Sequence, residues 1–397
     1  MFRYIILISI IYLLYLPLSA QDKGGIPAAQ KSFGDGVTIV DNDDYSFSLS
    51  SNFQPRMTIN QTLNEDLDPE FAALIRRLRL RFSGFILDKN LTYLIHLAFS
   101  QRDMESTGRP DDYPGVIFDA YINYQFAPKT SLYFGQMKLP GNLSRLMSFT
   151  GLNFTERSAA ESEFTPYRDI GFQIHNEFGI GNYHQRQAFA ITNGEGKNRE
   201  AIGDGLCYSG RVEVLPLGLF AEKGEYYEPD LAREESPKLA VGAAYLYNDN
   251  ARRTASTLGK TMPESADMQT MMLDLNFKWR GFNIFAEYFR RTSDKNVIIE
   301  TDPLNIYYIR AGEGYSVQCG YVTRGGWGFA LRYADVLPES DGLMTFHPEK
   351  NLTLGFAKYF RGNDLKLQAD VNYLRREVLN SWIYENVRFV MQIVFII

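Results

Sequence analysis

The sequence predicts an all-β protein: a transmembrane antiparallel β-barrel of about 16 strands, with 18 strands as the alternative count. Two observations lead to this fold class. Apolar and polar residues alternate one by one along most of the chain, which is the pattern of strands with one apolar face. The alternating segments run for about 9–12 residues, which is long enough to cross a membrane as tilted strands. A soluble β-sandwich also alternates, but its strands are usually shorter.

The first 20 residues have the layout of a secretory signal peptide. Arg3 supplies the positive charge, residues 5–16 form an apolar stretch too short to span a bilayer comfortably, and small residues precede a cleavage point after Ala20. The alternative is an uncleaved membrane anchor. We assign residues 21–44 to a periplasmic N-terminal segment and residues 45–397 to a barrel in the cell outer membrane.

The strands are assigned from their alternation. Residues 77–82 place three arginines on one face of a strand and three apolar residues on the other, whereas a helix would mix the two sets. The same pattern recurs in residues 93–100, 119–126, 270–279, 365–373 and 388–397. Aromatic residues stand at the ends of several segments, as in the aromatic girdles of membrane barrels: Phe126, Trp279, Trp327 and Tyr373.

Short turns and long polar loops alternate between these strands. Short turns lie near residues 88–90, 128–129, 179–181, 280–281, 324–326 and 361–364. Longer loops lie roughly at residues 102–115, 139–168, 194–205, 249–265, 293–312, 337–348 and 375–384. Barrels place short turns in the periplasm and long loops outside, so 16 strands put both termini in the periplasm. Residues 216–237 fall where a short turn is expected. We interpret them as a long periplasmic connection; two additional strands there would make 18.

If the apolar face of each strand meets lipid, the other face lines the lumen. The basic residues on that face are Arg56, Arg77, Arg79, Arg81, Lys138, Arg186, Arg211, Lys278, Arg332, Lys366 and Arg388. The acidic ones are Asp119, Glu177, Glu213, Asp274, Glu287 and Asp370. The chain as a whole has a net charge of −6, so positive charge is concentrated inside. Such a lumen favours anions. The alternative is a lumen whose paired charges only stiffen the barrel.

Two groups of residues are candidates for the functional site. The predicted anion path consists of Arg77, Arg79, Arg81, Lys138, Arg211 and Arg332. Arg76 falls on the lipid-facing side of its strand, where a long side chain reaches the interface. Residues 139–168 form the third extracellular loop, which we expect to fold inward, because a barrel of about 16 strands otherwise encloses a wide channel. A flexible surface loop is the alternative. The charged residues of this predicted constriction are Arg145, Glu156, Arg157, Glu161, Glu163 and Arg168.

Eight short segments in order resemble the phosphate-selective porin O and P family of bacterial outer membranes. They are residues 71–80, 118–124, 134–140, 167–173, 237–242, 277–282, 314–320 and 330–333. The resemblance extends from about residue 45 to the C-terminus. It implies a 16-stranded porin, usually trimeric, with an inward third loop and an arginine-lined lumen.

Composition and motifs argue against other classes of function. The negative net charge gives no support to nucleic-acid binding. The two cysteines, Cys207 and Cys319, cannot form a disulfide framework or a structural zinc site. The sequence has four histidines and lacks a nucleophile motif, a phosphate-binding loop and a histidine pair at metal-ligand spacing. We therefore predict no catalytic residue, metal or cofactor.

The predicted function is passive diffusion of small hydrophilic solutes across the outer membrane, with a preference for anions that could include phosphate. The expected partners are these solutes, outer-membrane lipid and two further copies of the chain in a homotrimer. The alternatives are an outer-membrane barrel enzyme and a structural or adhesive barrel with a closed pore.

Overall fold

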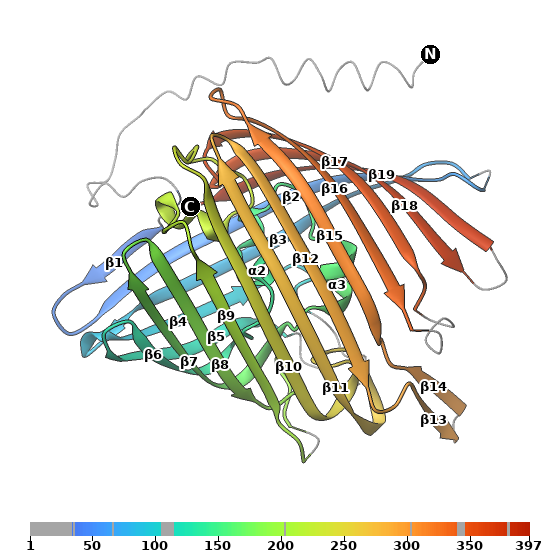
Figure 1. Cartoon of the computed structure of the whole chain (residues 1–397), viewed down its shortest axis with the longest axis horizontal. Helices are drawn as coiled ribbons and strands as arrows, with labels where there is room; N and C mark the ends of the chain where they lie inside the picture. The colour runs from blue at the N-terminus through green and yellow to red at the C-terminus, as the bar shows by residue number, and fades with distance from the viewer. Residues whose placement is uncertain are drawn as a thin grey trace. The chain divides into compact units, whose positions relative to one another are not determined.

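The structure is a computed structural model of the chain, and it describes residues 34, 36–65, 67–104, 115–201, 204–301, 304–339, 346–378 and 382–397. The predicted signal peptide, residues 1–20, lies outside the described residues. The described residues form a closed antiparallel barrel of sixteen strands, with one additional strand in the same sheet and a separate two-stranded hairpin (Figure 1). The prediction of an all-β barrel of about 16 strands is confirmed.

Each strand of the barrel pairs with the next one along the chain. The strands are β2 (Ser46–Thr62), β3 (Glu70–Ile86), β4 (Asp88–Ala98), β5 (Ile117–Ala127), β6 (Thr130–Lys138), β7 (Arg168–Ile180), β8 (Tyr183–Thr192), β9 (Cys207–Leu215), β10 (Lys238–Ala255), β11 (Leu258–Trp279), β12 (Phe282–Ser293), β15 (Gly312–Val322), β16 (Trp327–Pro338), β17 (Glu349–Arg361), β18 (Leu365–Val378) and β19 (Trp382–Ile396). Pairing of β19 with β2 closes the ring, so no barrel strand has a free edge.

Three short strands lie outside this ring. β1 (Val37–Asp41) pairs with the beginning of β2 and occupies the described end of the predicted N-terminal segment. β13 (Val297–Thr301) and β14 (Leu304–Tyr308) form a separate two-stranded hairpin between β12 and β15. Residues 216–237 contain the 3-10 helix η2 (Ala221–Tyr226) and no strand, so the alternative count of 18 strands is wrong.

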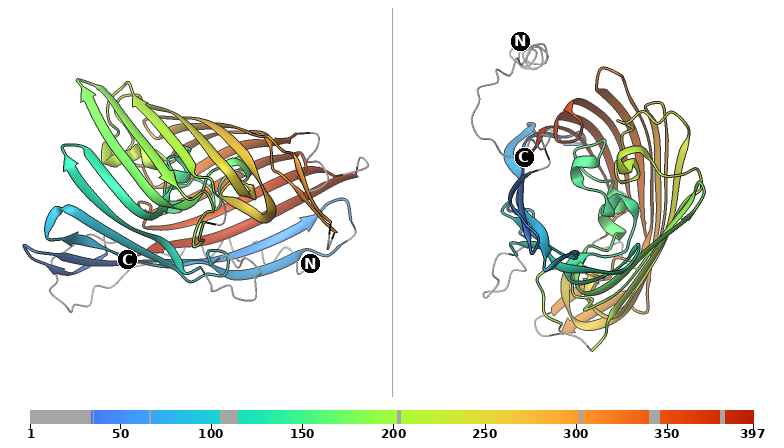
Figure 2. Two further views of the ribbon diagram at one scale, coloured as in Figure 1. Left: turned by 90° about the horizontal axis from the view of Figure 1, so that it is seen from below. Right: turned by 90° about the vertical axis from the view of Figure 1, so that its left-hand side faces the viewer.

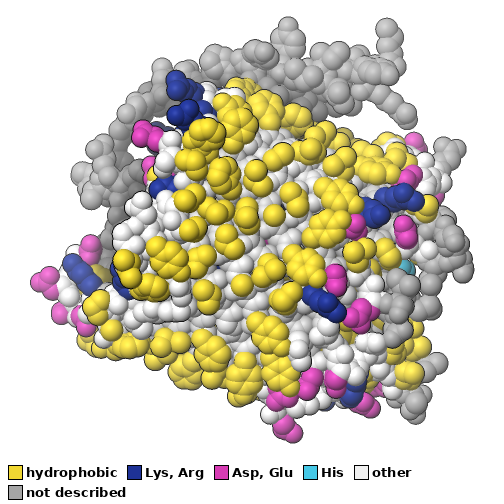
Figure 3. Space-filling view, viewed as in Figure 1, with side chains coloured by type: hydrophobic (Ala, Val, Ile, Leu, Met, Phe, Trp, Pro, Cys, Tyr) yellow, Lys and Arg dark blue, Asp and Glu magenta, His cyan; other side chains and the backbone are white. Residues whose placement is uncertain are grey.

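The outward face of the barrel is apolar, as the alternation predicts. Leu273 is 44% exposed, whereas its neighbour Asp274 is 4% exposed and faces the interior. Hydrophobic side chains cover the wall seen in Figure 3, and charged side chains gather toward its margins. Phe126, Trp279 and Trp327 are exposed beside short turns, where an aromatic girdle is expected.

Two predicted loops are largely strand. β10 and β11 continue through residues 249–265 and turn only at Ser256 and Thr257. β18 and β19 likewise extend into residues 375–384. Beyond the apolar band neither face of a strand meets lipid, so the alternation of apolar and polar residues fades although the backbone pairing continues.

Loop L3, which we define as residues 139–167 between β6 and β7, lies inside the barrel (Figure 2). It contains α2 (Leu143–Leu146), the 3-10 helix η1 (Phe149–Gly151) and α3 (Ala159–Phe164). Phe164 of α3 is fully buried and belongs to an apolar cluster with Phe289 and Met272 of the barrel wall. In the described part of the chain, no helix is long and apolar enough to cross a membrane.

Two glycines on the wall make room for L3. A Cβ atom at Gly314 of β15 would lie 2.7 Å from the ring of Phe164, and one at Gly355 of β17 would lie 2.8 Å from the ring of Phe154. These distances are too short for any larger residue without movement of the loop. The glycines therefore let the loop approach the strand backbone closely.

A second connection enters the barrel from the opposite end. Residues 216–237, between β9 and β10, run from the end that carries the short turns, and Lys278 holds them by donating to the carbonyls of Gly224 and Pro229. Their Glu228 meets L3: its backbone N donates to Gly151 O, and its carboxylate accepts from Asn153 N, both at 2.7 Å. The two connections thus fill much of the lumen beside β9–β18.

Candidate functional site

A polar cavity of about 770 Å³ remains between L3 and the wall formed by β2–β7. Its lining includes Asn363 and Asp364 at the short-turn end and Arg102 and Leu258 at the long-loop end. Residues from both ends of the strands therefore border one continuous space. This is the arrangement expected of a passage through the barrel.

Basic residues dominate the wall of this cavity. Nine line it: Arg76, Arg77, Arg79, Arg81, Arg102, Lys138, Arg145, Arg157 and Arg168. Five acidic residues line it as well: Asp103, Asp119, Glu156, Glu161 and Asp364. A water-filled space with this excess of fixed positive charge attracts anions.

A β-bulge places Arg76 in the lumen and corrects its predicted lipid-facing position. The pairing of β2 with β3 goes from Gln54–Arg77 directly to Pro55–Ile75, so Arg76 is an extra residue on β3. A bulge of this kind turns adjacent side chains to the same face, which simple alternation does not anticipate. Pro55 stands at this point because it has no N–H to offer the ladder.

Three arginines of the wall converge on Glu156 of L3. Its carboxylate lies 2.5 Å from Arg56 Nη1, 2.6 Å from Arg76 Nε and 3.2 Å from Arg77 Nη2. Burial raises the pKa of the Glu156 carboxyl, but the charges of Arg77, Arg56 and Arg76 outweigh this effect and hold the pKa well below its ordinary value. Glu156 is therefore ionised at neutral pH.

A second group of ion pairs lies beside the first. Arg79 Nε lies 2.8 Å from Asp103 Oδ2, and Arg168 Nε lies 2.7 Å from Asp119 Oδ1. Both guanidinium groups lie over the ring of Phe118, at 3.8 Å and 3.6 Å from its centroid. These contacts fix the two arginines against the wall and leave little of their charge uncompensated.

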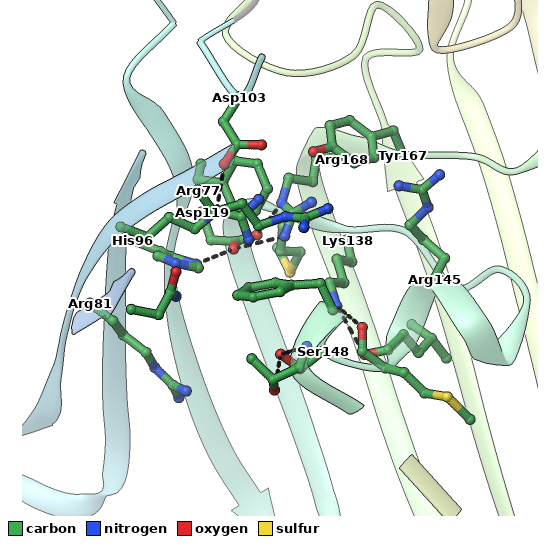
Figure 4. A pocket seen from close by; sticks show the side chains of 18 of the residues that line it. Arg77, Arg81, His96, Asp103, Asp119, Lys138, Arg145, Ser148, Tyr167 and Arg168 are labelled. Atoms are coloured by element: carbon green, nitrogen blue, oxygen red, sulfur yellow. Dashed lines mark hydrogen bonds and ion pairs between the residues drawn. The ribbon is translucent and has the colours of Figure 1, made fainter. Parts of the chain in front are cut away.

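Arg81 differs from the other arginines of its strand. It is exposed within the cavity, and it has no hydrogen bond or ion pair among the residues that the structure describes. Figure 4 shows its side chain apart from the dashed contacts around Asp103 and Asp119. Its charge is therefore available to a solute.

Three further basic residues of the cavity, Lys138, Arg145 and Arg157, contact L3 residues. Lys138 Nζ donates to Leu146 O at 2.9 Å and to Met147 O at 3.0 Å, near the C-terminal end of α2. Glu161 is fully buried and has Arg145 Nε at 2.8 Å and Arg157 Nε at 3.5 Å. These two ion pairs lie within L3 and fix its shape, whereas Lys138 of β6 attaches the loop to the wall.

Three of the predicted site residues do not line the cavity. Arg211 is buried in ion pairs with Asp274 and Glu213 on the opposite side of the barrel. Arg332 donates to Glu156 O beneath L3. Glu163 pairs with Arg310. For Arg211 and Arg332, strand phase shows that the side chain faces inward but not that an inward connection covers it. Glu163 lies on α3 of L3, to which strand phase does not apply.

The sequence does not indicate several residues of the site. Its alternation places Arg56 in the lumen but not in the predicted anion path, and it places Arg76 on the wrong face. Pro55 inside a strand was the one local signal of a bulge. Nothing local marks Asp103 or Phe149, which reach the arginines from loops. In the described residues, no group of three potential ligands is placed to hold a metal ion.

Solved outer-membrane proteins have the same fold at low sequence identity. The outer membrane channel DcaP of Acinetobacter baumannii has a TM-score of 0.57 and 11% identity, over 89% of this chain and 98% of that one. An anion-selective porin from Comamonas acidovorans has a TM-score of 0.54 and 10% identity, over 89% of this chain and all of that one. OmpF of Salmonella typhi, in a complex with daunomycin, has a TM-score of 0.54 and 11% identity, over 90% of this chain and 99% of that one.

A search of curated proteins gave no match. The family comparison is more specific, because the sequence matches phosphate-selective porin O and P over residues 49–381, which includes most of the barrel and all of L3. This confirms the resemblance stated from the eight segments. The chain belongs to the phosphate-selective porin O and P family of outer-membrane channels.

Proposed function

We propose that this channel passes small hydrophilic solutes by passive diffusion along β2–β7 and that it favours anions. The observation that carries this proposal is the charge of the cavity wall, which has nine basic residues and only five acidic ones. At the low identities found, the likeness to an anion-selective porin concerns the fold alone. The anion preference is therefore argued from the residues of this chain.

The basic residues have two roles in this proposal. Arg81 offers an uncompensated charge to a passing anion, since it has no partner among the described residues. Arg77 and Arg79 are paired with Glu156 and Asp103. They therefore shape the wall of the passage and attract an anion less strongly than Arg81 does. Lys138 supports the loop that narrows the passage.

The proposal includes the export and assembly expected from the sequence. Residues 1–20 direct export and are removed after Ala20, and three copies assemble in the outer membrane. No catalytic activity is expected, and membership of a family of channels supports this. A barrel with a closed pore is the competing function, because L3 and residues 216–237 fill part of the lumen.

Recording from purified protein in planar lipid bilayers tests the proposal. We expect stepwise conductance, and its absence in repeated insertions would favour the closed barrel. Arg81→Gln should reduce the ratio of anion to cation permeability, because the substitution removes an uncompensated charge from the cavity. Arg375→Gln is a matched control, since Arg375 is exposed near the long-loop end and does not line the cavity. An equal reduction in both variants would show that Arg81 has no special place in the path.

A further inference from the structure

Three residues with aromatic rings lie together on the cavity wall, one each on β5, β6 and β7. The ring centroids of Tyr133 and His175 lie 4.5 Å apart, and those of Tyr121 and Tyr133 lie 5.6 Å apart. All three residues line the cavity and are only partly buried. We call them the aromatic surface. The passage is therefore bordered by exposed ring faces as well as by charges.

The aromatic surface lies between L3 and the short-turn end of the barrel. β6 begins at Thr130 beside a short turn and ends at Lys138 beside L3, and Tyr133 lies between these ends. The pairing of β6 with β7 places Gln173 opposite Tyr133, and His175 is the next residue of β7 that lines the cavity. A solute that enters from the long-loop end and passes L3 therefore meets the aromatic surface next.

Hydrogen bonds fix the His175 ring and leave the tyrosine hydroxyls open to the cavity. Gln173 donates through Nε2 to Lys138 O at 2.8 Å, so its Oε1 accepts from His175 Nε2 at 3.0 Å. The hydroxyl groups of Tyr121 and Tyr133 have no hydrogen-bond partner among the residues that the structure describes. A tyrosine that serves only to pack the wall usually has its hydroxyl bonded, so these two are available to a solute.

Arg81 adds a positive charge beside the aromatic surface. Strand pairing aligns Arg81 with His96 of β4 and His96 with Asp119 of β5. Tyr121 is the next residue of β5 that lines the cavity, and it is close enough to Arg81 for the two to interact electrostatically. Leu94, which is opposite Tyr121 on β4, lines the same part of the cavity. Figure 4 shows the Arg81 side chain extending away from the ion pairs around Asp119.

We propose that Tyr121, Tyr133, His175 and Arg81 form a subsite for a planar organic anion, namely a carboxylate attached to an aromatic ring. The carboxylate pairs with the guanidinium group of Arg81, and the ring of the solute packs against the aromatic surface in an offset or edge-to-face arrangement. A small anion without a ring gains only the contact with Arg81. The inference rests on the proposed function, since it names a class of solute for the passage.

The direct test compares benzoate with acetate as inhibitors of the chloride current in planar bilayers. Both have one carboxylate, which is ionised at about pH 7, but only benzoate has a ring. We expect benzoate to halve the wild-type current at a concentration about fivefold lower than acetate, because aromatic contacts strengthen binding by about this factor. Equal concentrations for the two anions would overturn the proposal.

The double variant Tyr121→Leu/Tyr133→Leu assigns the difference to the aromatic surface. Leucine keeps an apolar side chain but has no flat ring, so the difference between benzoate and acetate should fall below about twofold. If the double variant kept the full difference, benzoate would be blocking the passage by its size alone, and the proposal would be wrong.

Tyr124→Leu is the matched control on the same strand. Tyr124 is 48% exposed on the outward face of β5 and does not line the cavity. Its substitution should leave the difference between benzoate and acetate unchanged. An equal loss of the difference in Tyr124→Leu and in the double variant would contradict the subsite.

Arg81→Gln tests the charged part of the subsite. The variant should require more benzoate and more acetate for the same inhibition, because both carboxylates lose their partner. An unchanged benzoate concentration would show that Arg81 does not bind the solute. If the double leucine variant does not fold, this result and the wild-type comparison of the two anions still decide the proposal.

A second measurement is independent of conductance. A ligand that binds only the folded barrel stabilises it, so benzoate should raise the unfolding temperature of the wild type in detergent more than acetate does. Tyr121→Phe/Tyr133→Phe should behave like the wild type, because it keeps both rings. If the wild type gives no conductance steps, the proposed function fails, but this stabilisation still tests the subsite. If the channel conducts and prefers anions while benzoate and acetate act alike, only the subsite fails.

Discussion

At the scale of single residues, the channel wall contains two kinds of arginine. Arg77 and Arg79 lie within 3.2 Å of carboxylates, whereas Arg81, two positions further along the same face, has no partner among the described residues. A buried arginine that is paired with a carboxylate is held in a fixed position, but its positive charge is largely neutralised and attracts a passing anion only weakly. The alternative that the paired charges stiffen the barrel therefore fits part of this row, and the anion path fits the rest.

The depressed pKa of Glu156 leads to a prediction about pH. A carboxyl whose pKa is lowered by folding keeps its charge, and the stability that this charge confers, until the pH falls through the lowered value. Glu156 faces Arg56, Arg76 and Arg77, and Asp103 lies near the same arginines; the pKa of Asp103 is also lowered, because Arg79, Arg77 and Arg76 outweigh its burial. We expect the anion-to-cation permeability ratio to stay constant from about pH 7 to about pH 5.

Reversal potentials measured at both pH values check this prediction, with Glu156→Gln as the control that has no carboxyl to titrate. If the ratio rose on acidification in the wild type but not in the variant, Glu156 would be taking up a proton in this range. Its pKa would then not be depressed, and the ion cluster described around it would not exist in the membrane.

The sequence indicates the face of most charged residues but not their partners. Alternation correctly places Arg77, Arg79 and Arg81 in the lumen. It fails at Arg76, where one extra residue reverses the phase of the strand. The contact between Arg79 and Asp103 joins a strand to a loop, and no periodic pattern describes a loop.

At the scale of elements, the docking of L3 depends on small residues in the opposite wall. Phe154 is fully buried and packs directly over Gly355 of β17, where a Cβ atom would lie 2.8 Å from two atoms of its ring. Arg332 also lies against Phe154, with its Cζ atom 4.3 Å from the centroid of the ring. The absence of a side chain at Gly355 therefore leaves the space that the ring of Phe154 occupies.

We expect Gly355→Val to destabilise the barrel by about 1–3 kcal/mol, because the added side chain overlaps the ring of Phe154 and must displace L3. Denaturant titration in detergent measures the change. Gly210→Val on β9 is the matched control, since the nearest atoms there lie 3.9 Å from an added Cβ. Equal stability of Gly355→Val and the wild type would show that L3 does not rest on this strand.

Elements inside the apolar band are predictable from the sequence, and those outside it are not. In residues 270–279 and 365–373 one face of the strand must be apolar because it contacts lipid, so the alternation predicts which side chains face outward. The extension of β10 and β11 to residues 256–257 is not visible in the sequence, because its apolar residues do not alternate strictly. Ala251 and Met262, for example, pack in a buried cluster with Ile298 instead of facing lipid. The helices of L3 have at most six residues, too few for a helical pattern.

At the scale of the whole barrel, two connections from opposite ends determine where solutes can pass. L3 and residues 216–237 meet at Gly151, Asn153 and Glu228. The sequence predicts that L3 folds inward and that residues 216–237 form a long connection, but their meeting depends on contacts between distant positions. The position of these two connections explains why the side chain of Arg211 is buried while that of Arg81 borders the cavity.

The reversal potential of the wild-type channel in a potassium chloride gradient tests the central claim most directly. The excess of basic residues on the cavity wall predicts that chloride crosses more readily than potassium, so the dilute compartment becomes negative. A dilute compartment that becomes positive would show cation preference and contradict the anion path along β2–β7.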